Sequence, residues 1–420
     1  MIPSPSEPAP ARSFLARGPR GAFRWTAFAL SVTAFASATP TPLYPSYAAA
    51  FHFSSATLGL VFAVYTPGVF VTLFFLAPHA ERVGRRTLLT AGLVLAALGS
   101  IVFSVAHGVA ELALGRLLAG LAVGATTSVA TAAMSDLEPY RDQHHVARVA
   151  VAANFGGFAI GVLLSGAIVA YAPDPARWAY ALPVIAVGIG LLGVGATPET
   201  APAFVPGRGR PVQRVSVPPA LWRPFWVAAG GIAACYAIYG YFAALVPSYL
   251  RLDLAVRSPL AIGAFVALMF GVAAMTQLTT AQIRDRAALL LGLPILVVSL
   301  VALVVVIHLS IPVLLVPATL LLGVAVGLTF MGSVTLVDRV AEEEDRGEIL
   351  AGFYSAGYLA LAVPTIGIAE AADRVGLTSA GILFGALLAV AVGATYVITL
   401  RTATPPGGGG RPRGPSARAE

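Results

Sequence analysis

One arginine, Arg116, lies inside the long apolar run of residues 109–134. In a membrane-spanning helix such a charge costs at least about 2.5–3.5 kcal/mol, so its side chain should face protein or water. Its guanidinium could bind the anionic group of a ligand or take part in proton coupling. Alternatively, it is a structural group bonded to backbone carbonyls. Glu111 lies about 140° away around a helix and is not an ideal partner, so the partner of Arg116 stays open.

The segment 81–86, with the sequence ERVGRR, is the densest charge cluster between two apolar runs, residues 56–77 and 87–106. Each run is about 20 residues long, enough for an α-helix to cross the roughly 30 Å apolar core of a bilayer. Short loops rich in arginine stay on the cytoplasmic side of a membrane. This segment is therefore predicted to be a cytoplasmic connection between two spanning helices.

The composition is that of an integral membrane protein, with 58% hydrophobic and 11% charged residues. Soluble domains carry about 25% charged residues. All 26 basic residues are arginine. The absence of lysine excludes a P-loop and a Schiff-base site, which both need one. A single cysteine excludes an internal disulfide, and no metal-site spacing occurs, so we expect no metal, no cofactor apart from a coupling proton, and no nucleic-acid partner.

We expect an all-α integral membrane fold with twelve spans, at about residues 23–48, 56–77, 87–106, 109–134, 146–171, 178–196, 223–250, 259–281, 288–307, 312–337, 348–372 and 377–400. Residues 1–22 are rich in proline, alanine and arginine and are predicted to be a disordered basic cytoplasmic tail. Residues 197–222 would be a cytoplasmic linker, and residues 401–420 a disordered C-terminal tail.

The distribution of arginine orients these spans. The loops and tails assigned to the cytoplasm hold 21 arginines, and the loops assigned to the other side hold 4. One missed span would invert half of the chain and destroy this bias. We therefore expect a multi-pass protein of the plasma (inner) membrane with both termini in the cytoplasm.

Short motifs recur at a nearly constant offset. Pro-Ser-Tyr at 45–47 returns 202 positions later at 247–249, and Gly120 and Gly124 return 203 positions later as Gly323 and Gly327. Likewise, Glu-Arg at 81–82 is matched by Asp285-Arg286, 204 positions later. The spacing predicts two pseudo-symmetric six-helix halves in parallel orientation, residues 23–196 and 223–400.

The chain resembles the major facilitator superfamily of secondary transporters over about residues 23–400. The segment 81–86 is similar to the D-R-x-G-R-R core of that family's loop 2–3 signature, and Arg116 with Gly120 is similar to its R-x-x-x-G motif of helix 4. The signature acid here is glutamate, and segment 161–166, GVLLSG, lacks the proline of the antiporter motif. The resemblance implies one central site that is exposed alternately to the two sides of the membrane.

The same resemblance implies a cytoplasmic gate. Glu81 would meet the N-terminal end of helix 11, near Gly347 and Glu348, and Arg85 and Arg86 would pair with Asp136 or Glu138 when the cytoplasmic side is closed. Topology charges alone are the alternative. The full set of expected gate residues is Glu81, Arg82, Gly84, Arg85, Arg86, Asp136, Arg141, Asp285, Arg286 and Arg346.

In this family, helices 1, 4, 7 and 10 face the centre. The candidates on them are Arg116 with Glu111, Thr39, Thr41, Tyr44, Thr126, Tyr236, Tyr239, Thr329 and Ser333; Asn154, Gln277, Tyr354 and Tyr358 could reach in from neighbouring spans. A polar side chain in mid-membrane could equally bind a neighbouring helix. The set has no mid-span acid, which favours a neutral or amphipathic organic substrate, or an anion held by Arg116.

These observations favour a secondary active transporter of a small organic solute, acting by alternating access as a proton-coupled exporter and as a monomer in the bilayer. An uptake symporter or a uniporter is the nearest alternative, since only Glu111 and Glu370 supply carboxylates at the edges of spans. A polytopic membrane enzyme or sensor is less favoured, because the histidine pair at 144–145 has no catalytic motif around it. We therefore expect no enzymatic activity.

Overall fold

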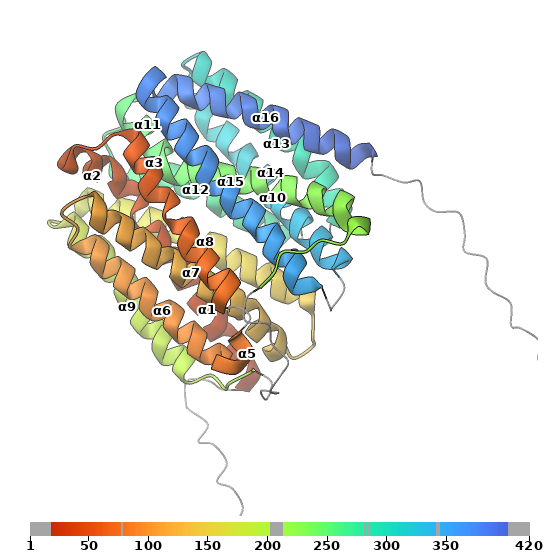
Figure 1. The fold of residues 1–420 in the computed structure, drawn as a ribbon. Helices are drawn as coiled ribbons and strands as arrows, with labels where there is room; N and C mark the ends of the chain where they lie inside the picture. The colour runs from red at the N-terminus through yellow and green to blue at the C-terminus, as the bar shows by residue number, and fades with distance from the viewer. Residues whose placement is uncertain are drawn as a thin grey trace, which may run out of the picture.

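The computed structural model describes residues 18–76, 79–201, 213–280, 283, 285–341 and 345–401, without the side chains of Glu81, His144 and Asp285. Within these ranges the chain forms helices and connections and no strand. Figure 1 shows long helices that run side by side in one bundle.

The N-terminal half begins with α1 (Gly18–Ala38), η1 (Thr41–Leu43) and α2 (Tyr44–Phe51), which together make the first expected span. The other elements of this half are α3 (Ser55–Ala63), α4 (Tyr65–Val71), η2 (Thr72–Leu76), α5 (Ala80–Val83), α6 (Arg85–Ser104), α7 (Val109–Leu137), α8 (Gln143–Tyr171) and α9 (Pro175–Gly195).

The C-terminal half repeats this plan after η4 (Pro219–Leu221). Its elements are α10 (Trp222–Ala244), α11 (Val246–Leu252), α12 (Pro259–Thr279), α13 (Asp285–His308), η5 (Pro312–Leu314), α14 (Leu315–Val340), α15 (Arg346–Val375) and α16 (Leu377–Arg401).

Among the described residues, eleven helical segments are long and apolar enough to cross a membrane. The remaining expected span is α1, whose two arginines, Arg20 and Arg24, and several hydroxyl residues lower its hydropathy. The predicted tail was too long: α1 begins at Gly18, so residues 18–22 are helical. Proline is tolerated in a first helical turn, and Arg20 donates a 3.2 Å hydrogen bond to the hydroxyl of Tyr140. Residues 1–17, 202–212 and 402–420 lie outside the described residues.

The first span of each half is broken at the same place. The break after α1 is held by Ser165 of α8, whose hydroxyl donates to the carbonyl of Thr39 at 2.7 Å. The equivalent break between α10 and α11 falls at Leu245, just before Pro247. Proline lacks a backbone donor, which loosens the helix ahead of it. The repeated Pro-Ser-Tyr motif therefore lies in both short helices, α2 and α11, which contact each other.

The repeated glycines allow a close contact between two helices in each half, at equivalent positions. A Cβ on Gly120 of α7 would lie 2.1 Å from the carbonyl oxygen of Tyr65 in α4. In the other half, a Cβ on Gly327 of α14 would lie 2.8 Å from the carbonyl oxygen of Ala273 in α12. Only glycine allows such close backbone contact. The same motif thus packs the fourth span against the second in each half.

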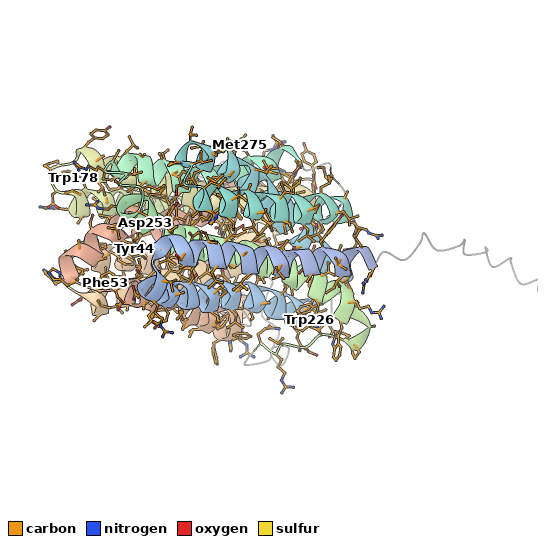
Figure 2. The ribbon with its side chains drawn as sticks, turned by 90° about the horizontal axis from the view of Figure 1, so that it is seen from above. Tyr44, Phe53, Trp178, Trp226, Asp253 and Met275 are labelled. Carbon is orange, nitrogen blue, oxygen red and sulfur yellow. The ribbon has the colours of Figure 1, made fainter. Side chains whose placement is uncertain are left out.

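The bundle has two distinct ends. We call the end with segments 80–86 and 137–143 the arginine-rich end, and the end with segments 52–54 and 253–258 the opposite end. Figure 2 shows Phe53, Trp178 and Asp253 toward one end and Trp226 toward the other. Trp178 and Trp226 are exposed, as expected where a bundle meets the two membrane interfaces.

The closest contacts between the halves gather at the opposite end. There α8 meets α12 at Gly166 and Gly263, where an added Cβ would lie 3.1 Å from the other residue's Cα. On the other side, α3 packs against α15, with Gly59 facing Ala369. One hydrophobic core joins these parts of the N-terminal half to the whole C-terminal half, whereas a second core, around Leu30, lies entirely in the N-terminal half.

Candidate functional site

A cavity lies between the two halves. Its lining side chains are Leu30, Ala34, Ser37, Phe62, Tyr65, Arg116, Val123, Thr127, Thr131, Ala150, Val151, Asn154, Phe155, Phe158, Tyr236, Tyr239, Ala243, Phe270, Phe330, Tyr354, Tyr358 and Leu361. Both halves therefore contribute to one site, as alternating access requires.

The helical repeat explains which residues face the cavity. On α7 the lining residues are Arg116, Val123, Thr127 and Thr131, which follow one another after seven, four and four positions. Such spacings place side chains on one face of a helix. Arg116 and Thr127 are about 16 Å apart along the axis, at about 1.5 Å per residue. One face of α7 therefore lines the cavity over about 22 Å, from Arg116 to Thr131.

Arg116 is buried, with 2% of its surface exposed. Its Nε donates to the hydroxyl of Tyr44, and its Nη1 donates to the carbonyl of Ser37 at 2.9 Å. The guanidinium carbon lies 4.9 Å from the ring centre of Phe62 and 5.7 Å from that of Phe103. These partners are neutral, and ring faces stabilise a cation by about 0.5–2 kcal/mol. The charge of Arg116 is thus solvated by dipoles and rings, and no described carboxylate pairs with it.

Aromatic rings from both halves form the wall of the cavity. Phe155 of α8 lies 5.2 Å from Tyr239 and 5.2 Å from Phe330, both in edge-on geometry, and Phe158 lies 4.1 Å from Phe270. Such pairs contribute about 0.5–1.5 kcal/mol each beyond buried area. The rings hold the halves together and present broad apolar faces to a ligand.

Among the described residues, three buried polar atoms on the cavity wall lack a hydrogen-bond partner: Nη2 of Arg116, Oγ1 of Thr127 and the hydroxyl of Tyr239. Leaving a buried donor unpaired costs about 1–3 kcal/mol. Native structures keep few such groups, and those that remain in a cavity are candidates to meet a ligand. All three can donate a hydrogen bond to a ligand, but Thr127 lies about 16 Å from Arg116 along α7 and cannot meet the same ligand group.

Several side chains proposed from the sequence do line the cavity: Arg116, Asn154, Tyr236, Tyr239, Tyr354 and Tyr358. Tyr44 does not, but it orients Arg116 through its hydroxyl. The other candidates do not line the cavity. In the N-terminal half, Thr39 donates to the carbonyl of Phe35, and Thr126 contacts Thr33. In the C-terminal half, Thr329 packs against Gly292 and Ser333 against Gly231; the remaining candidates absent from the lining are Thr41, Gln277 and Glu111. Of these groups, Thr39 bonds back to α1, the helix that it follows, and Thr126 bonds to another helix through Thr33.

The sequence reading missed two parts of the site. It selected Thr126, whereas Thr127 lines the cavity, because one residue turns a side chain by about 100° on a helix. It also missed the phenylalanines Phe155, Phe158, Phe270 and Phe330. Their signal is weak, since apolar side chains in a spanning helix can face lipid, core or cavity alike.

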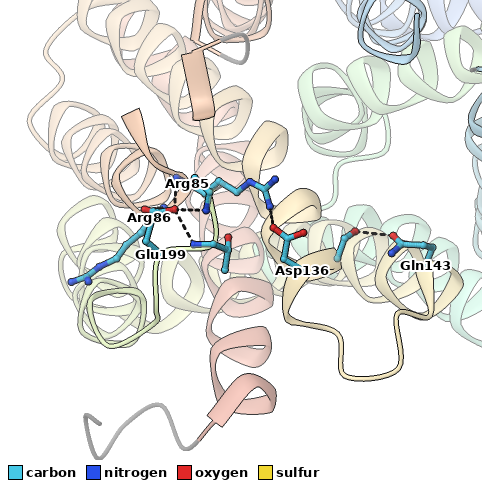
Figure 3. Close-up of polar contacts among 8 residues, drawn as sticks. Arg85, Arg86, Asp136, Gln143 and Glu199 are labelled. Carbon is cyan, nitrogen blue, oxygen red and sulfur yellow. Dashed lines mark hydrogen bonds and ion pairs between the residues drawn. The ribbon is translucent and has the colours of Figure 1, made fainter. Parts of the chain in front are cut away.

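At the arginine-rich end, Arg85 pairs with Asp136, as predicted (Figure 3). Glu199, which the sequence reading missed, binds the first turn of α6: its two carboxylate oxygens accept from the backbone N–H groups of Arg85 at 2.8 Å and Arg86 at 3.1 Å. Partial burial raises the pKa of Glu199, but hydrogen bonds from Ala201, Arg85, Arg86 and Thr200 outweigh it, so the pKa lies below its ordinary value. Negative charge at a helix N-terminus is favourable.

The remaining predicted gate residues are more scattered. Arg346 pairs with Asp338 of its own half, Arg82 and Arg86 have exposed side chains, and Arg286 and Arg141 are exposed as well. Gly84 has φ +92° and precedes α6, a backbone conformation that favours glycine. Glu138 is buried beside His145 rather than paired with an arginine. The side chains of Glu81 and Asp285 lie outside the described part of the chain, and so does the predicted contact between Glu81 and the eleventh span, α15.

Gln213, at the end of the linker, lies beside the eleventh span, α15. The backbone N–H of Gln213 donates to the carbonyl of Phe74 in η2 at 2.9 Å. A Cβ on Gly347 of α15 would lie 3.1 Å from Nε2 of Gln213. The linker therefore touches both halves at the arginine-rich end. Here Arg85 and Arg346 form their ion pairs within a half.

At the opposite end, a carboxylate joins the two halves. Asp373, near the end of α15, accepts hydrogen bonds from the backbone N–H groups of Ser55 and Ala56, both at 2.9 Å. These donors belong to the first turn of α3, where the helix dipole favours an anion. The contact fastens the C-terminal half to the N-terminal half next to the close packing of Gly59 and Ala369.

The sequence profile of the Major Facilitator Superfamily matches residues 26–365. The chain belongs to the Major Facilitator Superfamily. Its membership agrees with the helical fold and the two related halves, and it makes the protein a membrane transporter rather than an enzyme. The expectation drawn from segment 81–86 and Arg116 is therefore confirmed at the level of family and fold.

Relatives within the superfamily match parts of the chain. An uncharacterized MFS-type transporter, YwfA of Bacillus subtilis (strain 168), is 32% identical over 118 residues, or 27% of this chain and 29% of the relative. Multidrug resistance protein 2 of the same organism is 25% identical over 130 residues, or 31% of this chain and 32% of the relative. The aligned region thus spans less than a third of each relative.

The fold has a counterpart among solved structures. The crystal structure of a D-xylose-proton symporter matches 89% of this chain and 96% of its own, with a TM-score of 0.71 and 13% sequence identity. At this identity the similarity establishes the fold of this superfamily member and not its substrate.

Proposed function

We propose that this protein is a secondary active transporter that exports a small organic solute across the plasma membrane by alternating access, with a proton as the coupling ion. The cavity between the halves carries the proposal, because it holds the buried charge of Arg116 and is lined from both halves. Closure at one end by Asp373 and the glycine contacts is the arrangement that a rocking mechanism uses.

The proposed orientation follows from charge. Positive loops stay inside, so the arginine-rich end and both termini are placed in the cytoplasm. The cavity then lies on the cytoplasmic side of the contacts at the opposite end. The Arg85–Asp136 pair and Glu199 would hold the connection between α5 and α6 during the movement. We further propose that the protein acts as a monomer.

Export is supported by one relative, whose name is Multidrug resistance protein 2. Proton coupling is supported by the structural match to a proton symporter. Glu111, a half-buried carboxylate in the first turn of α7, is the candidate for the proton pathway, because it precedes Arg116 on the same helix. Movement of a proton to and from Glu111 would change the field at Arg116.

A second candidate is uniport of a charged solute along the membrane potential. It is favoured by one observation: no Asp, Glu or His is among the described lining residues of the cavity. Each elementary charge that crosses the membrane gains about 2.3 kcal/mol per 100 mV. Such a transporter would need no titrating group. An uptake symporter, like the D-xylose-proton symporter, remains the nearest alternative in direction.

Everted membrane vesicles separate these candidates. An imposed pH gradient is followed with acridine orange while solutes are added to vesicles with the wild-type protein or with Glu111→Gln. An exporter coupled to protons dissipates the gradient when its solute is added, and the Glu111→Gln variant does not. Solute counterflow that leaves the gradient unchanged would contradict proton coupling and favour uniport.

A further inference from the structure

We infer that the transported solute is an organic anion with an aromatic or similarly broad apolar body, whose negative group binds beside Arg116. This inference rests on the transport function proposed above and adds the chemical class of the solute.

The charge of Arg116 favours an anionic solute. Among the described lining residues, Arg116 is the one that carries a full charge. Its hydrogen-bond partners are a hydroxyl and a carbonyl, and neither neutralises it. A cation buried with neutral partners is costly. An anionic group in the cavity would offset that cost, whereas a cationic solute would add to it.

Unpaired hydrogen-bond donors in the cavity also favour a solute with a negative group. Nη2 of Arg116 is buried and lacks an acceptor, although the guanidinium has two other bonds. Guanidinium groups bind carboxylates and phosphates through two parallel N–H groups. The hydroxyl of Tyr239, which the C-terminal half contributes to the cavity, also lacks a partner among the described residues. The guanidinium can only donate hydrogen bonds and the Tyr239 hydroxyl can donate one, so both can bind a ligand group that accepts hydrogen bonds.

The aromatic rings of the cavity wall favour a solute with a broad apolar body. Rings of Phe155, Phe270 and Phe330 surround Tyr239 at centre distances of 5.2, 5.3 and 6.5 Å. Planar apolar groups pack edge-on or offset against such rings. Of the lining side chains that the structure describes, the half-buried Asn154 is the one amide, and the other neutral polar side chains carry hydroxyls. An amphipathic anion uses both features, with its charge at Arg116 and its body against the rings.

The direct test is a panel of solutes that share a ring and differ in charge. Phenylacetate, indole-3-acetate and 1-naphthylacetate are compared with their neutral amides and with the corresponding arylethylamines. Purified protein in proteoliposomes is assayed for counterflow and for thermal stabilisation. We expect the acids to be transported and to bind at least tenfold more tightly than the amides, with no binding of the amines.

Variants locate the negative group. In Arg116→Gln the preference for acid over amide should fall at least tenfold, and Arg116→Lys should keep part of it. The matched control is Arg251→Gln, which removes an exposed arginine outside the cavity and should leave the preference unchanged. Tyr239→Phe removes a hydroxyl without loss of volume; it should weaken acid binding severalfold while the unliganded protein becomes no less stable. This variant keeps the test decisive if Arg116→Gln does not fold.

The outcomes separate the solute class from the transport function. Counterflow of amides or amines without acids would overturn the anion assignment and leave the transporter intact. Equal acid and amide affinity in the wild-type protein, or an unchanged preference in folded Arg116→Gln, would also overturn it. Absence of counterflow for every probe, in a protein that remains folded, would overturn the assigned solute class, and the gradient assay in everted vesicles tests the transport function separately.

Discussion

The two halves share one backbone plan and present different walls to the cavity. Equivalent positions, 202 to 204 residues apart, line it from both sides. The pairs are Ala34 and Tyr236, Ser37 and Tyr239, Thr127 and Phe330, Ala150 and Tyr354, and Asn154 and Tyr358. In each of these pairs the N-terminal residue is small or polar and the C-terminal residue is aromatic, whereas Phe158 and Leu361, 203 residues apart, reverse this order.

Arg116 sharpens this contrast. Its equivalent in the C-terminal half, 203 residues later, is Thr319, which is fully buried and absent from the cavity lining. The N-terminal half thus supplies the charge, and the C-terminal half supplies the larger share of the rings. A duplicated framework can separate these tasks because a side chain can change while the glycine contacts that set the backbone stay. We expect each half to control a different property of the transported solute.

The largest expected effect concerns the shared framework. Gly120→Val should prevent folding, because a Cβ there would lie 2.1 Å from a backbone oxygen of α4 that cannot move aside. Overpacking costs about 1–3 kcal/mol or more. Gly271→Ala, whose Cβ would meet only Ala159 at 3.9 Å, is the control. Expression and size-exclusion profiles in detergent check this, and a well-folded Gly120→Val protein would contradict the close approach.

The second prediction compares Arg116 with Thr319, the residue at the equivalent position of the other half. Arg116→Thr, which installs the residue of the equivalent position, should lower transport about 100-fold, or about 2.7 kcal/mol. Thr319→Val should leave transport within about threefold and stabilise the protein, since the Thr319 hydroxyl is buried without a partner. Counterflow rates and thermal unfolding are the measurements. Similar losses in both variants would show that the halves are not specialised.

The third prediction addresses the rings. Tyr236→Ala should weaken binding of aromatic acids and amides alike by about tenfold, since a stacked ring contributes about 0.5–1.5 kcal/mol. The ratio of acid to amide affinity should stay constant, whereas Arg116 variants change that ratio. Titrations followed by protein fluorescence measure both affinities. A selective loss of acid binding in Tyr236→Ala would break the division of tasks.

The fourth prediction compares the contacts at the two ends. Asp373→Ala removes the bonds to Ser55 and Ala56 that join the halves. It should shift the population toward separation at the opposite end by about 1 kcal/mol, roughly fivefold. Spin labels at His52 and Leu377 in a Cys235→Ala background report the distance across that end. Arg85→Ala, which breaks a contact within one half, should leave this distance distribution unchanged.

The smallest expected effect is a dependence on pH. The pKa of Glu199 is lowered in the folded protein, so the contact with α6 is fully present above the ordinary glutamate range. It is lost as pH falls through the lowered folded value, because protonation removes the charge that the backbone donors stabilise. Since Glu199 is exposed, the effect on stability should stay under about 1 kcal/mol. Glu199→Gln should flatten this part of the acid profile of thermal unfolding; an unchanged profile would contradict the assignment.

The sequence predicted much of the fold because a bilayer imposes strong, local rules. Spans must be about 20 apolar residues long, and arginine gathers in the loops of one side. These rules needed only composition and order along the chain. The repeated Gly120 and Gly323, and the two Pro-Ser-Tyr motifs, revealed the duplicated halves for the same reason.

Arg116 was also visible in the sequence, because a charge in an apolar run is costly and must have a purpose. Tyr236 and Tyr239 followed from their position on the seventh span. The choice of Thr127 over Thr126 did not, because a rotation of about 100° decides which hydroxyl enters the cavity. That rotation is set by the contacts of α7 with α4 and α6, which are absent from a linear pattern.

The remaining parts depended on contacts between distant segments. Glu199 meets Arg85, and Asp373 meets Ser55, across long stretches of chain. Nothing local marks these carboxylates, since each lies in an ordinary polar connection or helix end. By itself the sequence determined the membrane class, the duplicated halves and the buried arginine. Only the tertiary structure decided which rings surround that arginine, which donors stay unpaired and which carboxylate joins the halves, because packing between helices fixes those relations.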